Sequence, residues 1–296
     1  MSKPQPVRKA VLPVAGMGTR FLPATKAVPK EMLPVVDKPV VQYAVEEARE
    51  AGIEQFIFVT GRGKAIIEDH FDHAYELEML LSAREKTAEL NSLLEGLPVT
   101  GAVSFTRQQK PMGLGHAVWS ARHLVGNEPF AVLLPDDLMV GTPGGLAQMV
   151  EVYERVGGGI IVAAEEKPLE EVRRYGVISP GETKGNAVEV KGVVEKPKPT
   201  KAPSRLCIIG RYILQSEIFA ELDRHETGAG GEIQLTDSMA RLIGRMPFHA
   251  VKTACARYDC GDKVGFLHAN IAVALRRPDI APALKAILRE INSNPS

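Results

Sequence analysis

The sequence predicts an α/β fold with a mixed, largely parallel sheet flanked by helices. Short apolar runs of strand length alternate with amphipathic segments of helix length, a glycine-containing loop follows the first apolar run, and after residue 167 strands separated by turns replace this alternation. With 296 residues, 45% of them hydrophobic, the chain can bury a full core. We therefore expect one Rossmann-like domain over residues 1–296, in which a second half from about 167 adds a substrate-binding lobe to a first half that ends at about 166.

The first half is expected to alternate strands with helices. Each expected strand is a short apolar run, and these runs cover residues 10–14, 55–60, 102–106, 130–134 and 159–164. The expected helices are residues 40–51, which Gly52 would end, and residues 115–124.

An insertion at residues 68–95 is expected to form an acidic helix. It holds eight acidic and two basic residues, which is a net charge of −6. Such a run is typical of a solvated helical face, and a subunit contact is the alternative.

The second half is expected to begin with strands and to end with helices. The strands are predicted at residues 177–178, 187–194 and 206–214. The helices are predicted at residues 216–224, 233–244, 264–274 and 281–291. The chain has no Gly/Ser-rich linker and no internal repeat, which supports a single domain.

Charge and cysteine content exclude several classes of function. Lysine plus arginine and aspartate plus glutamate both number 36, so the net charge of zero argues against a nucleic-acid or anionic-membrane partner. Cys207, Cys255 and Cys260 fit neither a disulfide framework nor a metal knuckle, and we expect buried thiols. No apolar run approaches the ~20 residues that span a bilayer, and the N-terminal stretch is not typical of a secretory signal. A cytoplasmic protein is expected.

A glycine loop follows the first predicted strand. Ala15, Gly16, Gly18 and Thr19 lie in it, and glycine lets backbone N–H groups approach phosphate oxygens closely. A G-x-G pattern alone would also suit a dinucleotide-binding fold. That fold needs a third glycine where this chain has Phe21, and its acidic residue should end the second strand, whereas Asp37 lies in a turn context. A dehydrogenase is therefore disfavoured.

The segment after the glycine loop is basic and rich in proline. Residues 1–38 carry a net charge of +5 within a neutral protein. Arg20, Lys26 and Lys30 lie among Pro23, Pro29 and Pro34, which restrict φ and stiffen the loop. The pattern predicts a site for a phosphate-bearing ligand.

Two carboxylates follow the predicted strand 130–134. Asp136 and Asp137 should lie at the carboxyl edge of the sheet, where ligands of α/β proteins bind. Carboxylate oxygens suit Mg²⁺, which takes its remaining ligands from water and phosphate. Asp137 is either a second ligand or, as we favour, a cap near a helix.

Residues 16–30 resemble the signature G-x-G-T-R-x-x-P-x-[ST]-x-x-x-P-K of the sugar-1-phosphate nucleotidylyltransferases. FLPATKAVPKEMLPVVDKP at residues 21–39 is most similar to the bacterial, uridylyl-transferring branch of that family. The similarity continues in one order along nearly the whole chain, through GLGHA (113–117), LLPDD (133–137), YGVI (175–178), VVEKPKP (193–199), GEIQLTD (231–237) and YDCGDKVGF (258–266).

The resemblance implies a nucleotidyltransferase fold, with a nucleotide-binding half, a sugar-phosphate-binding half and C-terminal helices. It implies transfer of the uridylyl group of UTP to α-D-glucose 1-phosphate with Mg²⁺, giving UDP-glucose and pyrophosphate. It also implies a homo-oligomer, either a dimer or a tetramer. Two alternatives stay open, a related transferase that uses dTTP and a non-catalytic regulatory paralogue.

The resemblance also assigns site residues. The nucleotide-binding residues it implies are Ala15, Gly16, Gly18, Thr19, Glu31, Gln108 and Gly113. The sugar-phosphate-binding residues are Gly176, Glu195 and Lys196. The catalytic residues are Arg20, Lys30, Asp136 and Lys196, and the metal ligands are Asp136 and Asp259.

Two of these assignments have a physical basis of their own. Gln108 carries an amide donor and a carbonyl acceptor, which suit the edge of a pyrimidine. His116 is expected to position the helix predicted over residues 115–124. Adjacent residues of a strand point to opposite faces, but Pro197 predicts a strand end at which Glu195 and Lys196 could both reach a ligand. A sugar phosphate is already ionised near pH 7, so no general base is expected.

Overall fold

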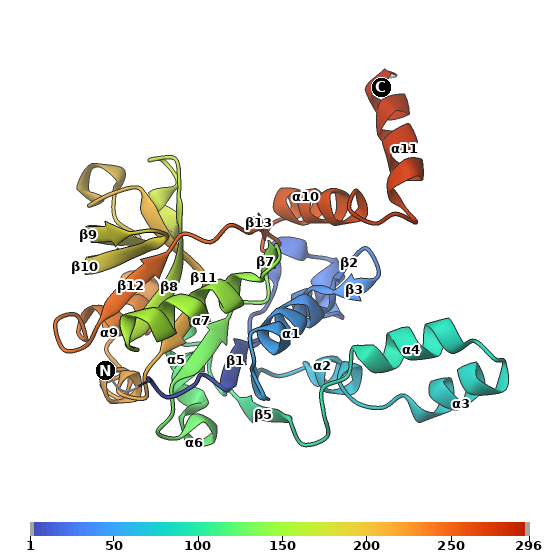
Figure 1. The fold of residues 1–296 in the computed structure, drawn as a ribbon, viewed down its shortest axis with the longest axis horizontal. Coiled ribbons are helices and arrows are strands. Elements are labelled where there is room, and N and C mark those ends of the chain that lie inside the picture. The colour runs from blue at the N-terminus through green and yellow to red at the C-terminus, as the bar shows by residue number, and fades with distance from the viewer. Residues whose placement is uncertain (1–2, 294–296) are drawn as a thin grey trace.

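A nine-stranded mixed sheet runs through both halves of the chain in the computed structural model, which describes residues 3–293 (Figure 1). Its strand order is β5-β4-β1-β6-β11-β8-β12-β10-β9. The strands are β1 (Lys9–Pro13), β4 (Gln55–Thr60), β5 (Val103–Arg107), β6 (Phe130–Leu133), β8 (Ile160–Glu166), β9 (Gly176–Lys184), β10 (Ala187–Glu195), β11 (Leu206–Leu214) and β12 (Phe248–Val251). The predicted mixed α/β sheet is confirmed.

Parallel pairing is concentrated in the first half of the chain. Strands β5, β4, β1 and β6 are parallel to one another, and β8 is parallel to β12. Strand β11, from the second half, lies antiparallel between β6 and β8. The parallel strands β1, β4 and β6 therefore end at one edge of the sheet, where the loops that follow them meet.

Helices cover both faces of the sheet. Helices α1 (Val40–Glu50) and α7 (Gly145–Val156) pack on one face, with Val41, Ala44 and Val45 of α1 buried. Helices α5 (Leu114–Ser120), α8 (Ile218–Leu222) and α9 (Leu235–Ala240) pack on the other face. Strands that are covered on both faces have continuous apolar sequences, and for this reason they could be predicted from the sequence.

The acidic insertion is not one helix. The chain forms α2 (Ala65–His70), α3 (Tyr75–Ala83) and α4 (Thr87–Glu95), so a single helix over 68–95 was wrong. The breaks lie between the helices, and the second includes Glu85 in the left-handed region at φ 55°. No side chain of α3 or α4 is buried, and the pair projects from the body (Figure 1). Both helices are exposed in the single chain, as a solvated face requires, and the choice between a solvated face and a subunit contact stays a prediction.

Other predicted elements are shorter than expected or were missed. The helix expected over 115–124 is divided between α5 and α6 (Arg122–Val125), and the one expected over 233–244 is only α9. The elements without a sequence prediction are α7, β12, the pair β2 (Pro34–Val35) and β3 (Lys38–Pro39), and the pair β7 (Asp137–Val140) and β13 (Ala256–Asp259).

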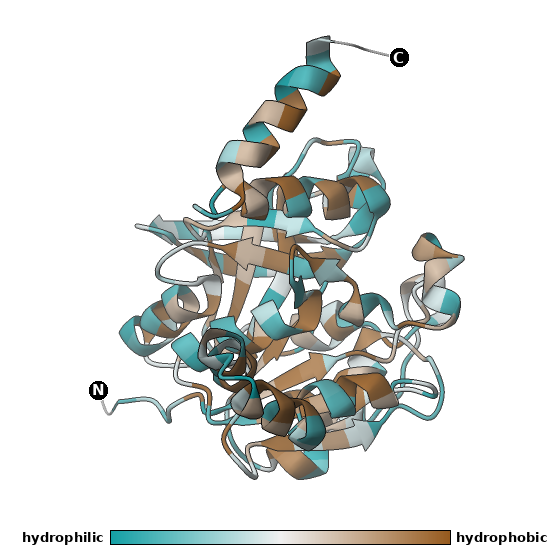
Figure 2. Cartoon of the chain, turned by 90° about the vertical axis from the view of Figure 1, so that its right-hand side faces the viewer, coloured by the Kyte–Doolittle hydropathy of each residue, from teal (hydrophilic) through white to brown (hydrophobic). Residues whose placement is uncertain are grey.

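Two helices follow the sheet. Helix α10 (Lys263–Ala274) packs beside β13, and α11 (Ala281–Ser293) extends away from the body (Figure 1). Apolar and polar bands alternate along α11 (Figure 2). Within residues 3–293, none of the helices has the length and apolar character to span a membrane. Cys207 and Cys260 are buried free thiols, as predicted, and Cys255 is half-buried.

Candidate active site

The loop after β1 forms one wall of a cavity of about 340 Å³. We call it the glycine-loop cavity; Ala15, Gly16, Lys26 and Gln108 are among the residues that line it. Gly18 adopts the left-handed region at φ 64°, and Thr25 Oγ1 donates a hydrogen bond of 2.7 Å to its carbonyl oxygen. A side chain at Gly18 would be strained, so glycine shapes this loop.

Lys30 joins the glycine loop to the carboxylate that follows β6. Its Nζ donates to Asp136 Oδ2 at 2.5 Å, and its Cε lies 3.5 Å from the position a Cβ would take at Gly16. Burial lowers the pKa of Lys30, but the Asp136 and Glu31 carboxylates outweigh burial and leave that pKa raised. Burial raises the pKa of Asp136, but Lys30 and Arg20 bring that pKa below its usual value. Both groups are therefore charged at neutral pH.

Glu31 is absent from the lining of both cavities, although its partner Lys64 lines the glycine-loop cavity. Lys64 Nζ donates to Glu31 Oε2 at 2.7 Å, and both side chains are buried. Burial raises the pKa of Glu31, although Lys64 and Lys30 oppose the shift. The Glu31–Lys64 pair joins the loop to the segment after β4, and the nucleotide contact expected for Glu31 stays a prediction.

A second cavity, of about 490 Å³, lies at the carboxyl edge of the sheet. We call it the carboxylate cavity; its lining includes Asp136, Asp259, Gly176, Glu195 and Lys196. Residues of the two halves of the chain therefore share one cavity.

Asp136 and Asp259 converge at Gly261. A Cβ placed there would lie 3.2 Å from Asp136 Oδ2 and 2.9 Å from Asp259 Oδ1. Arg20 reaches the same point, where its Nη1 donates to the Gly261 carbonyl at 3.2 Å. Residues 3–293 contain no cluster of three or more His, Cys, Asp or Glu side chains suited to a metal. Two carboxylates fit Mg²⁺, which commonly keeps several waters and phosphate oxygens.

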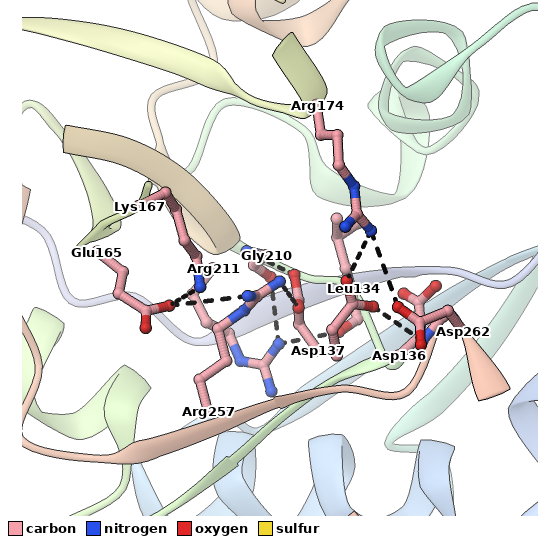
Figure 3. A network of polar contacts seen from close by, with 12 residues as sticks. Leu134, Asp136, Asp137, Glu165, Lys167, Arg174, Gly210, Arg211, Arg257 and Asp262 are labelled. Atoms are coloured by element: carbon pink, nitrogen blue, oxygen red, sulfur yellow. Dashed lines mark hydrogen bonds and ion pairs between the residues drawn. The ribbon is translucent and has the colours of Figure 1, made fainter. Parts of the chain in front are cut away.

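Asp137 is a structural carboxylate. Its Oδ2 accepts from the Gly210 N–H at 2.9 Å, and its Oδ1 pairs with Arg257 (Figure 3). The expectation of a helix-proximal cap was wrong, because β7 follows and pairs Asp137 with Asp259 of β13. Asp137 thereby holds the backbone of both candidate metal ligands.

A buried ion pair supports the same loop. Arg211 Nη2 contacts Glu47 Oε2 at 2.7 Å. Arg211 Nη1 donates to the Leu134 carbonyl at 2.9 Å (Figure 3). Glu47 Oε1 also accepts from the Leu146 N–H. Because α1, α7, β11 and the residue that follows β6 all contribute to this network, the segment that carries Asp136 is held in place.

The left-handed backbone at Lys196 brings two neighbouring side chains to one cavity. Glu195 ends β10 opposite Gly176 of β9, and Lys196 has φ 46°. Lys196 Nζ lies 3.3 Å from Glu195 Oε1, and both residues line the carboxylate cavity. A non-glycine residue in this region carries strain of about 1–3 kcal/mol, which is typical of functional sites. The turn overrides strand alternation, as Pro197 suggested.

Gln108 is held at the glycine-loop cavity by its amide group. Its Nε2 donates to the Gly113 carbonyl at 3.0 Å and lies 3.1 Å from His116 Nδ1. Burial, together with His225 and Arg122, lowers the pKa of His116, so a neutral imidazole can accept this bond. Within the described residues the Gln108 carbonyl oxygen accepts no hydrogen bond from the chain, and it is the atom left for a ligand.

The structure brings most predicted residues together and adds others. Arg20, Lys30, Asp136 and Asp259 form one group, and Gly176, Glu195 and Lys196 form another. Thr19, Gly18 and Gly113 lie outside the lining of both cavities, although Gly113 anchors Gln108. The sequence interpretation missed Lys64, Arg174 and Arg257, whose contacts are made with distant carboxylates.

Comparison with known proteins gives consistent matches. The family model described as nucleotidyl transferase matches residues 9–275. A UTP–glucose-1-phosphate uridylyltransferase of Komagataeibacter xylinus is 51% identical over 88% of this chain and 91% of its own length.

Solved structures agree in fold over most of the chain. A UDP-glucose pyrophosphorylase complexed with UDP-glucose has a TM-score of 0.81 and 43% identity, and covers 92% of this chain and 100% of its own. A UTP-bound UGPase from Acinetobacter baumannii has a TM-score of 0.87 and 39% identity, and covers 96% of this chain and 99% of its own.

Proposed function

The chain belongs to the nucleotidyl transferase family, and from this membership we propose that it transfers the uridylyl group of UTP to α-D-glucose 1-phosphate, giving UDP-glucose and pyrophosphate. The observation that carries the proposal is the position of Lys30. It reaches from Gly16, in the lining of one cavity, to Asp136, in the lining of the other. Two phosphate-bearing substrates, one in each cavity, would meet at this point.

The glycine-loop cavity is assigned to the nucleotide. The free Gln108 carbonyl oxygen can accept the N3–H of uracil, and cytosine has no such donor. The backbone of Ala15 and Gly16 leaves room for the base and the phosphates, and Lys30 lies where the α-phosphate would be held. Thymine also carries an N3–H, so dTTP is the informative competitor.

The carboxylate cavity is assigned to the sugar phosphate. Glu195 is placed to accept hydrogen bonds from sugar hydroxyls, Gly176 allows close approach, and the Lys196 ammonium can pair with the phosphate. A phosphate monoester has its second pKa near ~6, so its oxygen can attack the α-phosphorus in line without a general base. Repulsion between the two anions is then the main barrier, and Arg20, Lys30 and Lys196 reduce it.

A divalent cation belongs to this proposal, and we assign it to Mg²⁺. Asp136 and Asp259 would hold it, since their oxygens converge at Gly261 and hard carboxylate donors suit this ion. When bound, it would neutralise phosphate charge. The chain's own contribution is to fix both carboxylates, through Asp137 and its contacts with Gly210 and Arg257.

Pyrophosphate release across a panel of substrates tests the function. With glucose 1-phosphate as the acceptor, we expect kcat/KM for UTP to exceed that for CTP, ATP, GTP and dTTP by about tenfold or more. With UTP as the donor, we expect the same preference for glucose 1-phosphate over other sugar 1-phosphates. Tenfold corresponds to a difference of ~1.4 kcal/mol in transition-state binding. The product should be UDP-glucose. Faster pyrophosphorolysis of dTDP-glucose than of UDP-glucose would reassign the nucleotide, and inactivity with every pair would favour a regulatory protein.

The family resemblance to oligomeric enzymes also leads us to propose a homo-oligomer that uses helix α11. Ile287 and Ile291 are 51% and 60% exposed, and with Leu284 and Leu288 they form one stripe at helical spacing. Extended helices with an exposed apolar stripe are often covered by a partner. Sedimentation velocity should give a multiple of 32.1 kDa for the wild type and a lower mass for Ile287→Asp. A wild-type mass of one chain would contradict the proposal, and Arg289→Gln on the opposite side of α11 serves as control.

A further inference from the structure

Each of the two candidate metal carboxylates already carries a cationic side chain. Lys30 Nζ lies 2.5 Å from Asp136 Oδ2, and Arg174 Nη2 lies 3.3 Å from Asp259 Oδ2. Arg174 also lies 3.9 Å from Asp262, and Figure 3 shows its guanidinium turned toward this group of carboxylates. Arg20 adds a third cation next to Gly261. The point where a metal ion would bind is therefore surrounded by positive charge that belongs to the chain.

These cations reduce what a metal ion could gain by binding alone. A carboxylate paired with an ammonium group is largely neutralised, and a divalent ion must displace that group or bind beside it. The Lys30 and Asp136 side chains are only 23% and 29% exposed, so water screens their attraction incompletely. The Arg174–Asp259 pair is more exposed and weaker, with 46% of the Arg174 side chain accessible.

Each of the two cations, Lys30 and Arg174, also lies within reach of a place where a substrate phosphate is expected. Lys30 Nζ is 3.9 Å from the Cβ position of Gly16, so a phosphate in the glycine loop could take over the ammonium with little movement. Arg174 lines the carboxylate cavity together with Lys196 and Gly176, where the sugar phosphate is assigned. Incoming phosphates would therefore draw each cation from its carboxylate and leave the carboxylates free.

We propose that Lys30 and Arg174 act as tethered counter-ions that keep Asp136 and Asp259 closed to the metal ion until phosphates arrive. The proposal rests on the proposed function, because it takes these carboxylates as the metal ligands. Metal and nucleotide then bind with positive coupling, which is reciprocal by thermodynamic linkage. Arg174 becomes a positioning residue for the carboxylate site and a ligand for the sugar phosphate.

Binding of Mn²⁺ to the full-length protein without nucleotide tests the proposal. Free Mn²⁺ can be measured by electron paramagnetic resonance during a titration, which requires no turnover. We expect weak binding by the wild type. Lys30→Met and Arg174→Gln should each tighten it, the first by about tenfold, within the ~5–150-fold range typical of coupled sites. Arg205→Gln removes an exposed arginine paired with Glu166, and it should leave the affinity unchanged.

The outcomes separate the inference from the function on which it rests. If Lys30→Met combined with Asp136→Asn binds Mn²⁺ as tightly as Lys30→Met alone, the carboxylates are not the metal site and the inference fails, whatever the substrate panel shows. If Asp136→Asn loses binding but Lys30→Met and Arg174→Gln do not gain it, the metal site stands and the counter-ion proposal is overturned. Tight nucleotide-free binding by the wild type would also overturn it. Thermal melting of each variant verifies that it is folded.

Discussion

Replacing Asp136 by alanine is expected to lower kcat by about 10²- to 10³-fold while the fold survives. The change removes the partner of Lys30 and one of the two carboxylates that converge at Gly261. Electrostatic stabilisation of transferring phosphates is commonly the largest catalytic contribution, and losing one preorganised group costs about 10²–10³ in kcat. The side chain is 29% exposed, so no large cavity forms in the core. Steady-state rates at saturating Mg²⁺ and a melting curve are the measurements.

Two further variants sharpen the result. Asp136→Asn keeps the shape of the side chain and removes only its charge, so an equal loss of activity would assign the effect to charge. Asp69→Asn alters an exposed carboxylate of α2 and should leave kcat unchanged. A rate near that of the wild type for Asp136→Ala at saturating Mg²⁺ would show that Asp136 is not a metal ligand.

The elements that the sequence predicted well are those whose burial is complete. Strands β4 and β11 were predicted with the bounds that the structure has, because continuous apolar runs mark strands covered on both faces. Helix α7 was missed although its sequence carries a signal. Leu146, Met149, Val152 and Tyr153 are buried at helical spacing, and a search for that period would have found it.

The short strands β7 and β13 could not be predicted from the sequence, and the reason is physical. Strands β7 and β13 have four residues each and pair with each other across more than one hundred residues of sequence. Their stability comes from that long-range pairing and not from local propensity. The insertion shows the converse, because its charge pattern indicated exposure correctly but could not place the turns that divide α2, α3 and α4.

In the candidate site, too, residues within motifs could be predicted, whereas residues that act through long-range contacts could not. Motif residues such as Lys30, Asp136 and Lys196 were located by resemblance, and the structure places each at a cavity or between the two. The side chains that position them were not. Lys64 pairs with a carboxylate 33 residues away, Arg174 with one 85 residues away and Arg257 with one 120 residues away. No periodicity connects such pairs, so only the folded chain shows that Glu31 and Asp137 support the site from behind.

Lys196→Ala is expected to raise KM for glucose 1-phosphate by about 10- to 100-fold and to change KM for UTP by much less. A hydrogen bond to a charged group contributes about 1.5–3 kcal/mol, and every ~1.4 kcal/mol is tenfold in affinity. Lys196 lies in the carboxylate cavity, which is assigned to the sugar phosphate, and is absent from the lining of the glycine-loop cavity. Initial rates with each substrate varied in turn measure the two constants.

The left-handed backbone at Lys196 calls for a second variant, because alanine at φ 46° keeps the strain and removes the charge. Lys196→Gly relieves the strain and also removes the charge, so a similar rise in KM for both variants would assign the effect to the ammonium group. Lys198→Ala removes an exposed lysine two residues away, outside the lining of both cavities, and should leave both constants unchanged. Equal rises in KM for UTP and for glucose 1-phosphate would instead show that Lys196 shapes the site as a whole. The sugar phosphate would then need another cation in the carboxylate cavity, and Arg174 lines that cavity.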